Sequence, residues 1–376
     1  MKDQKGSQIG SVAEAQHHHE VCSYGENGKS FGCNRRGLKT VVTLVGLLVA
    51  CLVLFNAVNP YRLIPSSFYP KFGPRTLSPG FEYIELQKVL QKASMKDKTV
   101  VLTTLNDAWA EPNSIFDLFL ESFKIGNNTK GFLKHLVVIC FDQKAYDRCL
   151  AIHRHCYQLK PKTGANFTEE AFFMSQDYLE MMWTRIDFLS SILQLGYSFL
   201  FTDTDIMWFR DPFPRFHQDA DFQIACDYFN KNSYDLHNQP NGGFTYVRSN
   251  NRTIQFYKFW YFSRKVYPHM HDQDVLNKIK FDPFITNIGI KIRFLDTAYF
   301  GGFCQPSRDF NQVCTMHANC CVGLDNKIND LSILLNDWRN YMSLRPNTNS
   351  HSSWHVPQNC STSFDRMRKH KSGNNR

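Results

Sequence analysis

Short apolar runs alternate with longer runs of helical spacing through the middle of this 376-residue chain, and this alternation is the strongest constraint on its fold. Residues 99–105 and 135–141 are rich in β-branched and apolar side chains, as buried strands are. Residues 115–123 between them, and residues 179–195 later, carry apolar side chains three and four positions apart, which predicts helices. A further strand is predicted at 197–201. Strands and helices in this order predict a parallel sheet with helices on both faces.

Two aspartates, Asp203 and Asp205, come directly after the strand predicted at residues 197–201. Ligands of such sheets bind beyond the carboxyl ends of the strands. Because alternate side chains of an extended chain leave the same face, both carboxylates can converge on one cation, and their oxygens favour Mg²⁺ or Mn²⁺ over zinc. The alternative is a solvated turn with a capping aspartate. The apolar strand before the pair and the rigid segment 208–212 after it favour the cation site.

The segment FTDTDIMWFRDPF at residues 201–213 resembles the signature of the plant nucleotide-diphospho-sugar transferases of glycosyltransferase family 77. Three other segments fit that family, namely NGGFTYV at 241–247, HDQDVLN at 271–277 and CTMHANCCVG at 314–323. The resemblance spans roughly residues 98–340. It implies a GT-A fold, which is a Rossmann-like sheet with flanking helices. It also implies retaining, metal-dependent transfer of a sugar, a pentose or galactose, from a UDP-sugar to a cell-wall polysaccharide or glycoprotein.

The resemblance also implies roles for individual residues. Asp203, Asp205 and His317 would hold the cation, since imidazole is an acceptable ligand for Mn²⁺. Asp272 would grip hydroxyls of the donor sugar, and Gln273 would face the reacting carbon. A neutral amide is a poor nucleophile, so we expect front-face displacement, in which the leaving phosphate takes the proton of the acceptor. The sequence leaves double displacement open.

Further residues are candidates for binding the nucleotide sugar, and each has a structural alternative. Gly242 and Gly243 allow a ligand to approach the backbone closely, although Asn-Gly is also the strongest short signal for a hairpin turn. Arg185 can pair with a diphosphate or form a surface salt bridge on its helix. Residues 272–274 can cap a helix without contacting a ligand. The binding candidates are Thr103, Asn106, Arg185, Asp203, Thr204, Asn241, Gly242, Gly243 and Asp274.

Four cysteines surround His317 in the sequence, and they offer a second reading of that histidine as a ligand in a zinc cluster. They form no paired CxxC motif, and an oxidising compartment favours disulfides over zinc. We therefore expect disulfides in this region. The cysteines after residue 60 are odd in number, so at least one is unpaired or pairs with another chain. The four cysteines are Cys304, Cys314, Cys320 and Cys321.

An uncharged run at residues 40–58 is long enough, at about 1.5 Å per residue, to cross about 30 Å of hydrocarbon. Residues 1–39 are too long a leader for a cleaved signal peptide, and the basic residues before the run favour a cytoplasmic N-terminus. We therefore expect a single-pass type II protein anchored in the Golgi membrane by a transmembrane helix, with its body in the lumen.

A proline-rich stem would occupy 59–97, the GT-A domain 98–345, and a basic, disordered tail 346–376.

Four Asn-x-Ser/Thr triplets are compatible with a lumenal body, although such triplets often occur by chance. The predicted glycosylation sites are Asn127, Asn166, Asn251 and Asn359.

The charge balance argues against a nucleic-acid partner. Lys and Arg exceed Asp and Glu by 43 to 34, but the surplus is concentrated after residue 345, and residues 200–240 are acidic and aromatic.

Two other functions remain open. A metal-dependent phosphoesterase would usually need more ligands than Asp203, Asp205 and His317 supply. A non-catalytic carbohydrate-binding protein could keep the same fold.

Overall fold

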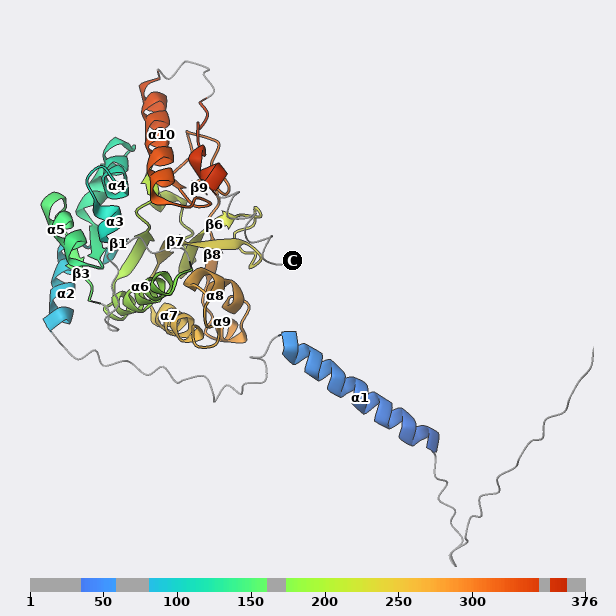
Figure 1. The fold of residues 1–376 in the computed structure, drawn as a ribbon. Coiled ribbons are helices and arrows are strands. Elements are labelled where there is room, and N and C mark those ends of the chain that lie inside the picture. The colour runs from blue at the N-terminus through green and yellow to red at the C-terminus, as the bar shows by residue number, and fades with distance from the viewer. Residues whose placement is uncertain (1–34, 59–80, 161–173, 345–351, 364–376) are drawn as a thin grey trace, which may run out of the picture. The chain divides into compact units, whose positions relative to one another are not determined.

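A computed structural model describes residues 35–58, 81–160, 174–344 and 352–363. The chain divides into two compact units, Met1–Pro65 and Ser66–Arg376. Figure 1 gives the labels of the helices and strands.

In the first unit, the described residues form helix α1 (Arg35–Val58). Among all described residues, no helix combines the length and the apolar character that crossing a membrane requires. The predictions of a transmembrane helix at 40–58, of a membrane-anchored protein and of a type II Golgi localisation with a lumenal body are therefore wrong. They relied on the absence of charge, which is a weaker condition than a continuous apolar helix. Polar residues such as Thr43 and Asn56 interrupt the run, and α1 begins before it, at Arg35.

In the second unit, the described residues form a seven-stranded sheet in the spatial order β3-β2-β1-β4-β7-β6-β8. Strand β7 is antiparallel to both of its neighbours, and every other pair in this sheet is parallel. The predicted α/β class with a mostly parallel sheet is confirmed. The strands are β1 (Thr99–Leu105), β2 (Leu136–Cys140), β3 (Cys156–Gln158), β4 (Ser198–Thr202), β6 (Phe222–Tyr228), β7 (Gln239–Val247) and β8 (Ile292–Phe294).

Helices cover both faces of this sheet (Figure 1). In β1, Val101 belongs to the hydrophobic core shared with α4 and α10, whereas Val100 and Leu102 belong to the core shared with α2, α6 and α7. This follows from the alternation of side chains along a strand. The helices of this unit are α2 (Phe81–Ala93), α3 (Asp107–Ala110), α4 (Ile115–Ile125), η2 (Lys130–Lys134), α5 (Gln143–Ile152), α6 (Gln176–Gln194), η3 (Phe213–Arg215), α7 (Asn251–Ser263), α8 (Asp272–Ile279), α9 (Pro283–Asn287) and α10 (Leu324–Ser343).

A second, three-stranded sheet of the described residues joins distant parts of the chain in the order β5-β10-β9. Its strands are β5 (Ile206–Trp208), β9 (Phe300–Gly302) and β10 (Thr315–His317). Strand β10 is antiparallel to β5 and places His317 opposite Ile206. His317 therefore lies beside Ile206, the residue that follows Asp205.

Two segments expected to be extended or disordered contribute to the folded body. Within the expected stem 59–97, residues 59–80 lie outside the described residues, but Leu86 and Leu90 of α2 are buried in the core. Within the expected tail 346–376, the described residues 352–363 include Trp354, whose ring stacks on Phe310 at 3.8 Å between centroids. The prolines before residue 80 concealed the helix. The packing of the tail depends on distant partners that the local sequence does not reveal.

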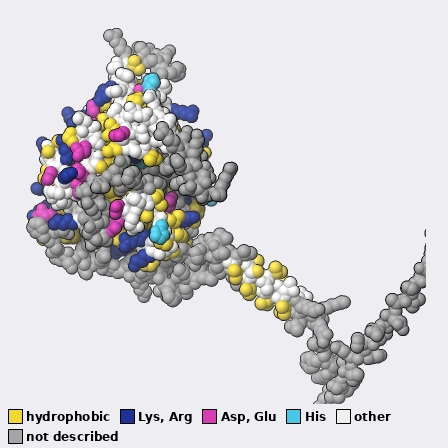
Figure 2. All heavy atoms as spheres, viewed as in Figure 1, with side chains coloured by type: hydrophobic (Ala, Val, Ile, Leu, Met, Phe, Trp, Pro, Cys, Tyr) yellow, Lys and Arg dark blue, Asp and Glu magenta, His cyan; other side chains and the backbone are white. Residues whose placement is uncertain are grey.

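Charges are mixed on the face of the molecule seen in Figure 2. Lys and Arg side chains are interspersed there with Asp and Glu side chains. The described Lys and Arg side chains are not gathered into one stripe on that face.

Candidate active site

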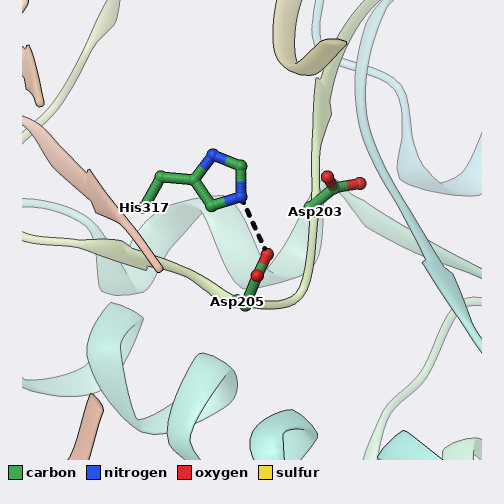
Figure 3. Close-up of side chains that lie close together, drawn as sticks. All are labelled: Asp203, Asp205 and His317. Carbon is green, nitrogen blue, oxygen red and sulfur yellow. Dashed lines mark ion pairs between the residues drawn. The ribbon is translucent and has the colours of Figure 1, made fainter. Parts of the chain in front are cut away.

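Asp203, Asp205 and His317 converge beyond the carboxyl end of β4 (Figure 3). One ligand atom from each side chain lies within 4.8 Å of the others. The backbone N–H of Asp203 donates to the carbonyl of Gly243 at 2.7 Å, which holds the turn against β7. The pairing of β10 with β5 brings His317 to the two carboxylates. The three predicted metal ligands are thus neighbours in space.

The chemistry of this triad fits a divalent cation. His317 Nε2 lies 3.1 Å from the buried Asp205 Oδ1, and the two side chains form an ion pair (Figure 3). A buried carboxylate needs such a compensating charge, which a bound cation would also supply. Two carboxylates and one imidazole are a donor set that Mn²⁺ and Mg²⁺ sites use.

The charges around Asp205 keep it ionised. Burial would raise the pKa of Asp205, but the ammonium of Lys327 and the imidazole of His317 outweigh burial and hold the pKa well below its ordinary value. The Lys327 Nζ lies 2.5 Å from Asp205 Oδ2. At Asp203 burial prevails over the attraction of Arg185, so the pKa of Asp203 is raised. The Asp205 carboxylate is therefore ionised in the folded protein.

Arg185 lies between the aspartate pair and helix α8. Its Nη1 donates to Asp203 Oδ1 at 3.0 Å and its Nη2 to Asp272 Oδ2 at 2.8 Å. Burial would raise the pKa of Asp272, but Arg185 lowers it to about 2. Because Arg185 is buried, it is not the surface salt bridge considered from the sequence. It holds two carboxylates from distant elements in place and compensates their charge.

The Asn241-Gly242-Gly243 segment is part of strand β7 and is not a hairpin turn. Its glycines serve close packing, since neither has a positive φ. A Cβ on Gly243 would lie 2.5 Å from Asp203 Oδ2 and 2.7 Å from His317 Cε1, so only glycine fits there. A Cβ on Gly242 would meet its nearest neighbour, Asp272 Oδ2, at an ordinary 3.5 Å.

Gln273 is held at both ends of its amide. Its Oε1 accepts from the backbone N–H of Gly242 at 3.0 Å, and its Nε2 donates to Asp227 Oδ2 at 2.9 Å. Since the backbone N–H of Gly242 can only donate and Gln273 Nε2 can only donate, these two hydrogen bonds fix the orientation of the amide. Asp227 was not among the predicted residues. It is the next-to-last residue of β6, so the rule that ligands bind at the carboxyl ends of strands could have found it.

One pocket with a volume of about 730 Å³ contains most of the predicted residues. Thr103 does not reach it: this side chain is buried within the sheet, and the next residue, Thr104, lines the pocket instead. Asp274 also lies outside the lining and pairs with His271 at 3.2 Å. The predicted residues that line the pocket are Asn106, Arg185, Asp203, Thr204, Asp205, Asn241, Gly242, Gly243, Asp272, Gln273 and His317.

Several lining residues were not predicted. Lys327 is far from Asp205 in the sequence, and no local signal marks it. His271 and Asn319 lie within the quoted segments 271–277 and 314–323, whereas Trp109, Tyr178 and Tyr228 lie outside every quoted segment. The unpredicted lining residues include Thr104, Trp109, Tyr178, Asp227, Tyr228, His271, Asn319 and Lys327.

The predicted glycosylation sites stay predictions. Asn127, Asn251 and Asn359 are exposed, and Asn166 lies outside the described residues.

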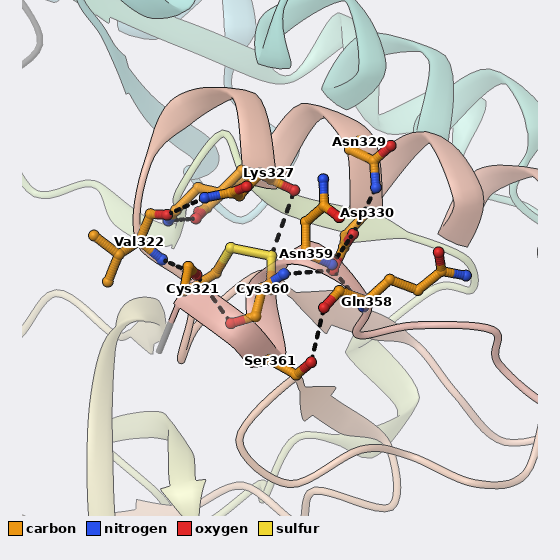
Figure 4. The surroundings of a disulfide bond; sticks show 12 residues. Cys321, Val322, Lys327, Asn329, Asp330, Gln358, Asn359, Cys360 and Ser361 are labelled. Atoms are coloured by element: carbon orange, nitrogen blue, oxygen red, sulfur yellow. Dashed lines mark hydrogen bonds and ion pairs between the residues drawn. A yellow bond between two sulfur atoms is a disulfide. The ribbon is translucent and has the colours of Figure 1, made fainter. Parts of the chain in front are cut away.

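Disulfides brace the wall of the pocket that carries His317. Cys304 is bonded to Cys320, and the next residue, Cys321, is bonded to Cys360 of the C-terminal segment (Figure 4). This confirms disulfides in place of a zinc cluster, while Cys314 is buried and unpaired.

Replacing both Cys304 and Cys320 with serine should lower the free energy of unfolding by about 3 kcal/mol, because their disulfide closes a loop with a sequence separation of 16. The loop contains His317, so we also expect a weaker stabilisation by Mn²⁺. Urea unfolding and thermal melts with Mn²⁺ would measure both effects.

The Cys149–Cys156 disulfide, with a separation of 7, is the matched control. Its removal should cost about 2 kcal/mol and leave the effect of Mn²⁺ unchanged, since neither cysteine lines the pocket. Equal responses to Mn²⁺ in both double variants would contradict the bracing role.

The comparison with known families decides the identity of the chain. Residues 131–331 match the model of the nucleotide-diphospho-sugar transferase family. The chain belongs to this family. It is therefore a nucleotide-sugar glycosyltransferase, as the resemblance of its motifs implied, and its donor is a nucleotide sugar.

Relatives of this transferase occur in plants. It is 53% identical to an uncharacterized protein of Arabidopsis thaliana over 278 residues, which cover 73% of each chain. A second uncharacterized Arabidopsis protein is 36% identical over 338 residues, 89% of this chain and 97% of that protein. A shorter match, 43% identical over 70 residues, covers 17% of this chain and 10% of the UDP-galactose:fucoside alpha-3-galactosyltransferase of Dictyostelium discoideum.

Solved glycosyltransferases show only weak overall similarity to this transferase. The apo form of mouse xyloside xylosyltransferase has a TM-score of 0.36 and 13% identity, covering 59% of this chain and 98% of the mouse chain. A glycosyltransferase of Streptococcus pneumoniae has a TM-score of 0.37 and 12% identity, covering 68% of this chain and 66% of that one. These scores are too low to support inferences about the site.

Proposed function

We propose that this transferase moves a pentose or galactose from a UDP-sugar to a polysaccharide or glycoprotein acceptor, with retention of the anomeric configuration and with Mn²⁺ or Mg²⁺. The observation that carries the proposal is the convergence of Asp203, Asp205 and His317 with Asp272 and Gln273 in one pocket. Membership of a sugar-transferase family favours this reaction over phosphate-ester hydrolysis.

The triad Asp203, Asp205 and His317 would hold the cation. When bound, the cation would act as a Lewis acid that neutralises the charge developing on the leaving diphosphate. Lys327 and His317 keep Asp205 ionised, and Arg185 orients Asp203. Because Arg185 is engaged by two carboxylates, it serves the site by positioning them and is not proposed to bind the diphosphate.

The donor sugar would lie between Asp272 and the glycine segment of β7. Asp272 is buried and ionised, so it can accept hydrogen bonds from sugar hydroxyls. Thr104, near the end of β1, and Asn106, the residue after this strand, line the same pocket and are proposed to contact the nucleotide. The Dictyostelium relative is named for UDP-galactose, which makes that donor the first to test.

A front-face displacement suits the groups near the sugar. The bond from the anomeric carbon to the phosphate oxygen breaks, the acceptor oxygen bonds to that carbon on the same face, and the acceptor proton passes to the leaving phosphate. Gln273 offers a neutral amide oxygen, which can stabilise positive charge but is a poor nucleophile. Asp227 accepts three amide hydrogen bonds, which weaken it as a nucleophile.

We expect Mn²⁺ alone to raise the melting temperature and UDP to bind only when Mn²⁺ or Mg²⁺ is present. A cation at about 100 times its Kd would stabilise the folded protein by about 2.7 kcal/mol. Thermal melts and calorimetric titration of UDP, each with and without EDTA, would measure this. UDP binding that EDTA does not change would contradict the cation site.

The transfer itself is tested by slow hydrolysis of UDP-galactose, UDP-xylose and UDP-arabinose without acceptor. A binding protein would hydrolyse none of them. A protein that neither binds UDP nor hydrolyses any of these donors would contradict the proposed function.

A further inference from the structure

Strand β6 is irregular where it reaches the pocket. Cys226 pairs with Pro240 and Tyr228 pairs with Gln239, so Asp227 is an extra residue without a partner on β7. In a regular strand, neighbouring side chains point to opposite faces. Asp227 and Tyr228 nevertheless both line the pocket, and a bulge of this kind explains how two successive side chains turn toward one cavity.

The Asp227 carboxylate is held by neutral amides. Asn241 Nδ2 and Asn319 Nδ2 each donate to Oδ1 at 2.8 Å, and Gln273 Nε2 donates to Oδ2 at 2.9 Å. A carboxylate has about four acceptor positions, so one position on Oδ2 is left for a donor outside this network.

The Arg and Lys side chains that line the pocket form ion pairs with carboxylates other than Asp227. Arg185 pairs with Asp203 and Asp272, and Lys327 pairs with Asp205. The remaining acceptor position of Asp227 therefore suits a neutral hydroxyl donor, since a hydroxyl can donate to an anion without bringing charge into the pocket.

Tyr228 supplies an aromatic surface beside this carboxylate. It is 55% exposed although it lines the pocket, and within the described residues its ring stacks on no other ring. A tyrosine offers a rigid apolar face together with a polar hydroxyl. A sugar ring has matching features, with C–H bonds on one face and hydroxyls at its edge.

We infer that Asp227 and Tyr228 form the acceptor subsite and that it takes a saccharide ring. Tyr228 packs against the apolar face of the ring, and Asp227 accepts a hydrogen bond from one of its hydroxyls. Because Asp227 also holds Gln273, this contact places the acceptor beside the amide that faces the donor. The inference rests on the proposed function and narrows the acceptor to a carbohydrate hydroxyl instead of an amino-acid side chain.

The first test is saturation-transfer NMR on the full chain with UDP and Mg²⁺. The probes are the methyl glycosides of galactose, xylose, arabinose and fucose. We expect saturation of ring protons in at least one glycoside, loss of that signal in Tyr228→Ala, and its return in Tyr228→Phe, which keeps the ring. Saturation of no glycoside, or equal saturation in Tyr228→Ala, would overturn the inference.

The control is Tyr234→Ala. Tyr234 is 61% exposed and does not line the pocket, although its ring, unlike that of Tyr228, packs against Arg293 and His217. This variant should keep the wild-type NMR signal. A loss equal to that of Tyr228→Ala would mean that the effect is not local to the pocket and would overturn the inference.

The second test measures sugar transferred to the bound glycoside against sugar released by hydrolysis. The ratio should fall about three- to tenfold in Tyr228→Ala, since an aromatic contact of this kind changes an equilibrium by about that factor. A ratio within twofold of wild type, or faster transfer to a hydroxyproline peptide than to any glycoside, would overturn the inference. If the wild-type protein neither binds UDP nor hydrolyses any UDP-sugar, the proposed function itself is contradicted.

Discussion

Replacing Asp205 with asparagine should lower the rate of sugar transfer by a factor of about 10² to 10³. The amide keeps the volume of the side chain but removes the negative charge that would bind the cation. Lys327 and His317 lose their ionised partner in a buried site, so we also expect lower stability. The rate is to be measured at saturating donor and Mn²⁺, and the rise of melting temperature with Mn²⁺ should disappear.

Asp211→Asn is the matched control for this variant. Asp211 lies a few residues further along the chain, accepts from the backbone N–H of Phe213 at 2.9 Å and does not line the pocket. An asparagine there can keep that hydrogen bond, so both the transfer rate and the response to Mn²⁺ should stay near wild type. An Asp205→Asn protein with the wild-type rate would remove the basis of the site assignment.

Replacing Gly243 with alanine should lower the free energy of unfolding by about 1–3 kcal/mol, because the new methyl group overpacks the site. It would have to lie 2.5 Å from Asp203 Oδ2 and 2.7 Å from His317 Cε1, distances that force one of these side chains to move. A displacement of about 1 Å can cost about a hundredfold in rate, and we expect a loss of at least that size. Urea unfolding, Mn²⁺ binding and transfer assays would measure the three effects.

The neighbouring glycine gives a sharp comparison. A methyl group on Gly242 would lie 3.5 Å from Asp272 Oδ2 and 3.6 Å from Arg185 Nη2, which are ordinary contacts. Gly242→Ala should therefore unfold and bind Mn²⁺ almost as the wild-type protein does. If Gly243→Ala matches Gly242→Ala in both measurements, the close approach of β7 to the triad is not a feature of the protein in solution.

The fold of the body could be predicted well because its signals are local. The predicted strand at 99–105 coincides with β1, and the helix predicted at 115–123 lies within α4. Residues 197–201 overlap β4 with a shift of one residue. Apolar periodicity and turn residues determine such elements within a few residues of sequence. Helix α2 was not predicted, because the prolines before it disfavour helix and the predicted extended stem was continued to residue 97.

The structure contradicts the membrane prediction. It was based on the lack of charge in residues 40–58, whereas a membrane span requires apolar character through a helix of full length. The lumenal topology depended on that span and is lost with it.

The sequence by itself determined the class of sheet, the place of Asp203 and Asp205 at a strand end, and the motifs that belong to the transferase family. Each of these depends on residues that are adjacent along the chain. Only the tertiary structure decided that Arg185 joins Asp203 to Asp272, that Lys327 reaches Asp205, and that a bulge turns Asp227 into the pocket. These contacts join residues far apart in the chain, and they arise from the packing of the sheet and its helices, which no local pattern records.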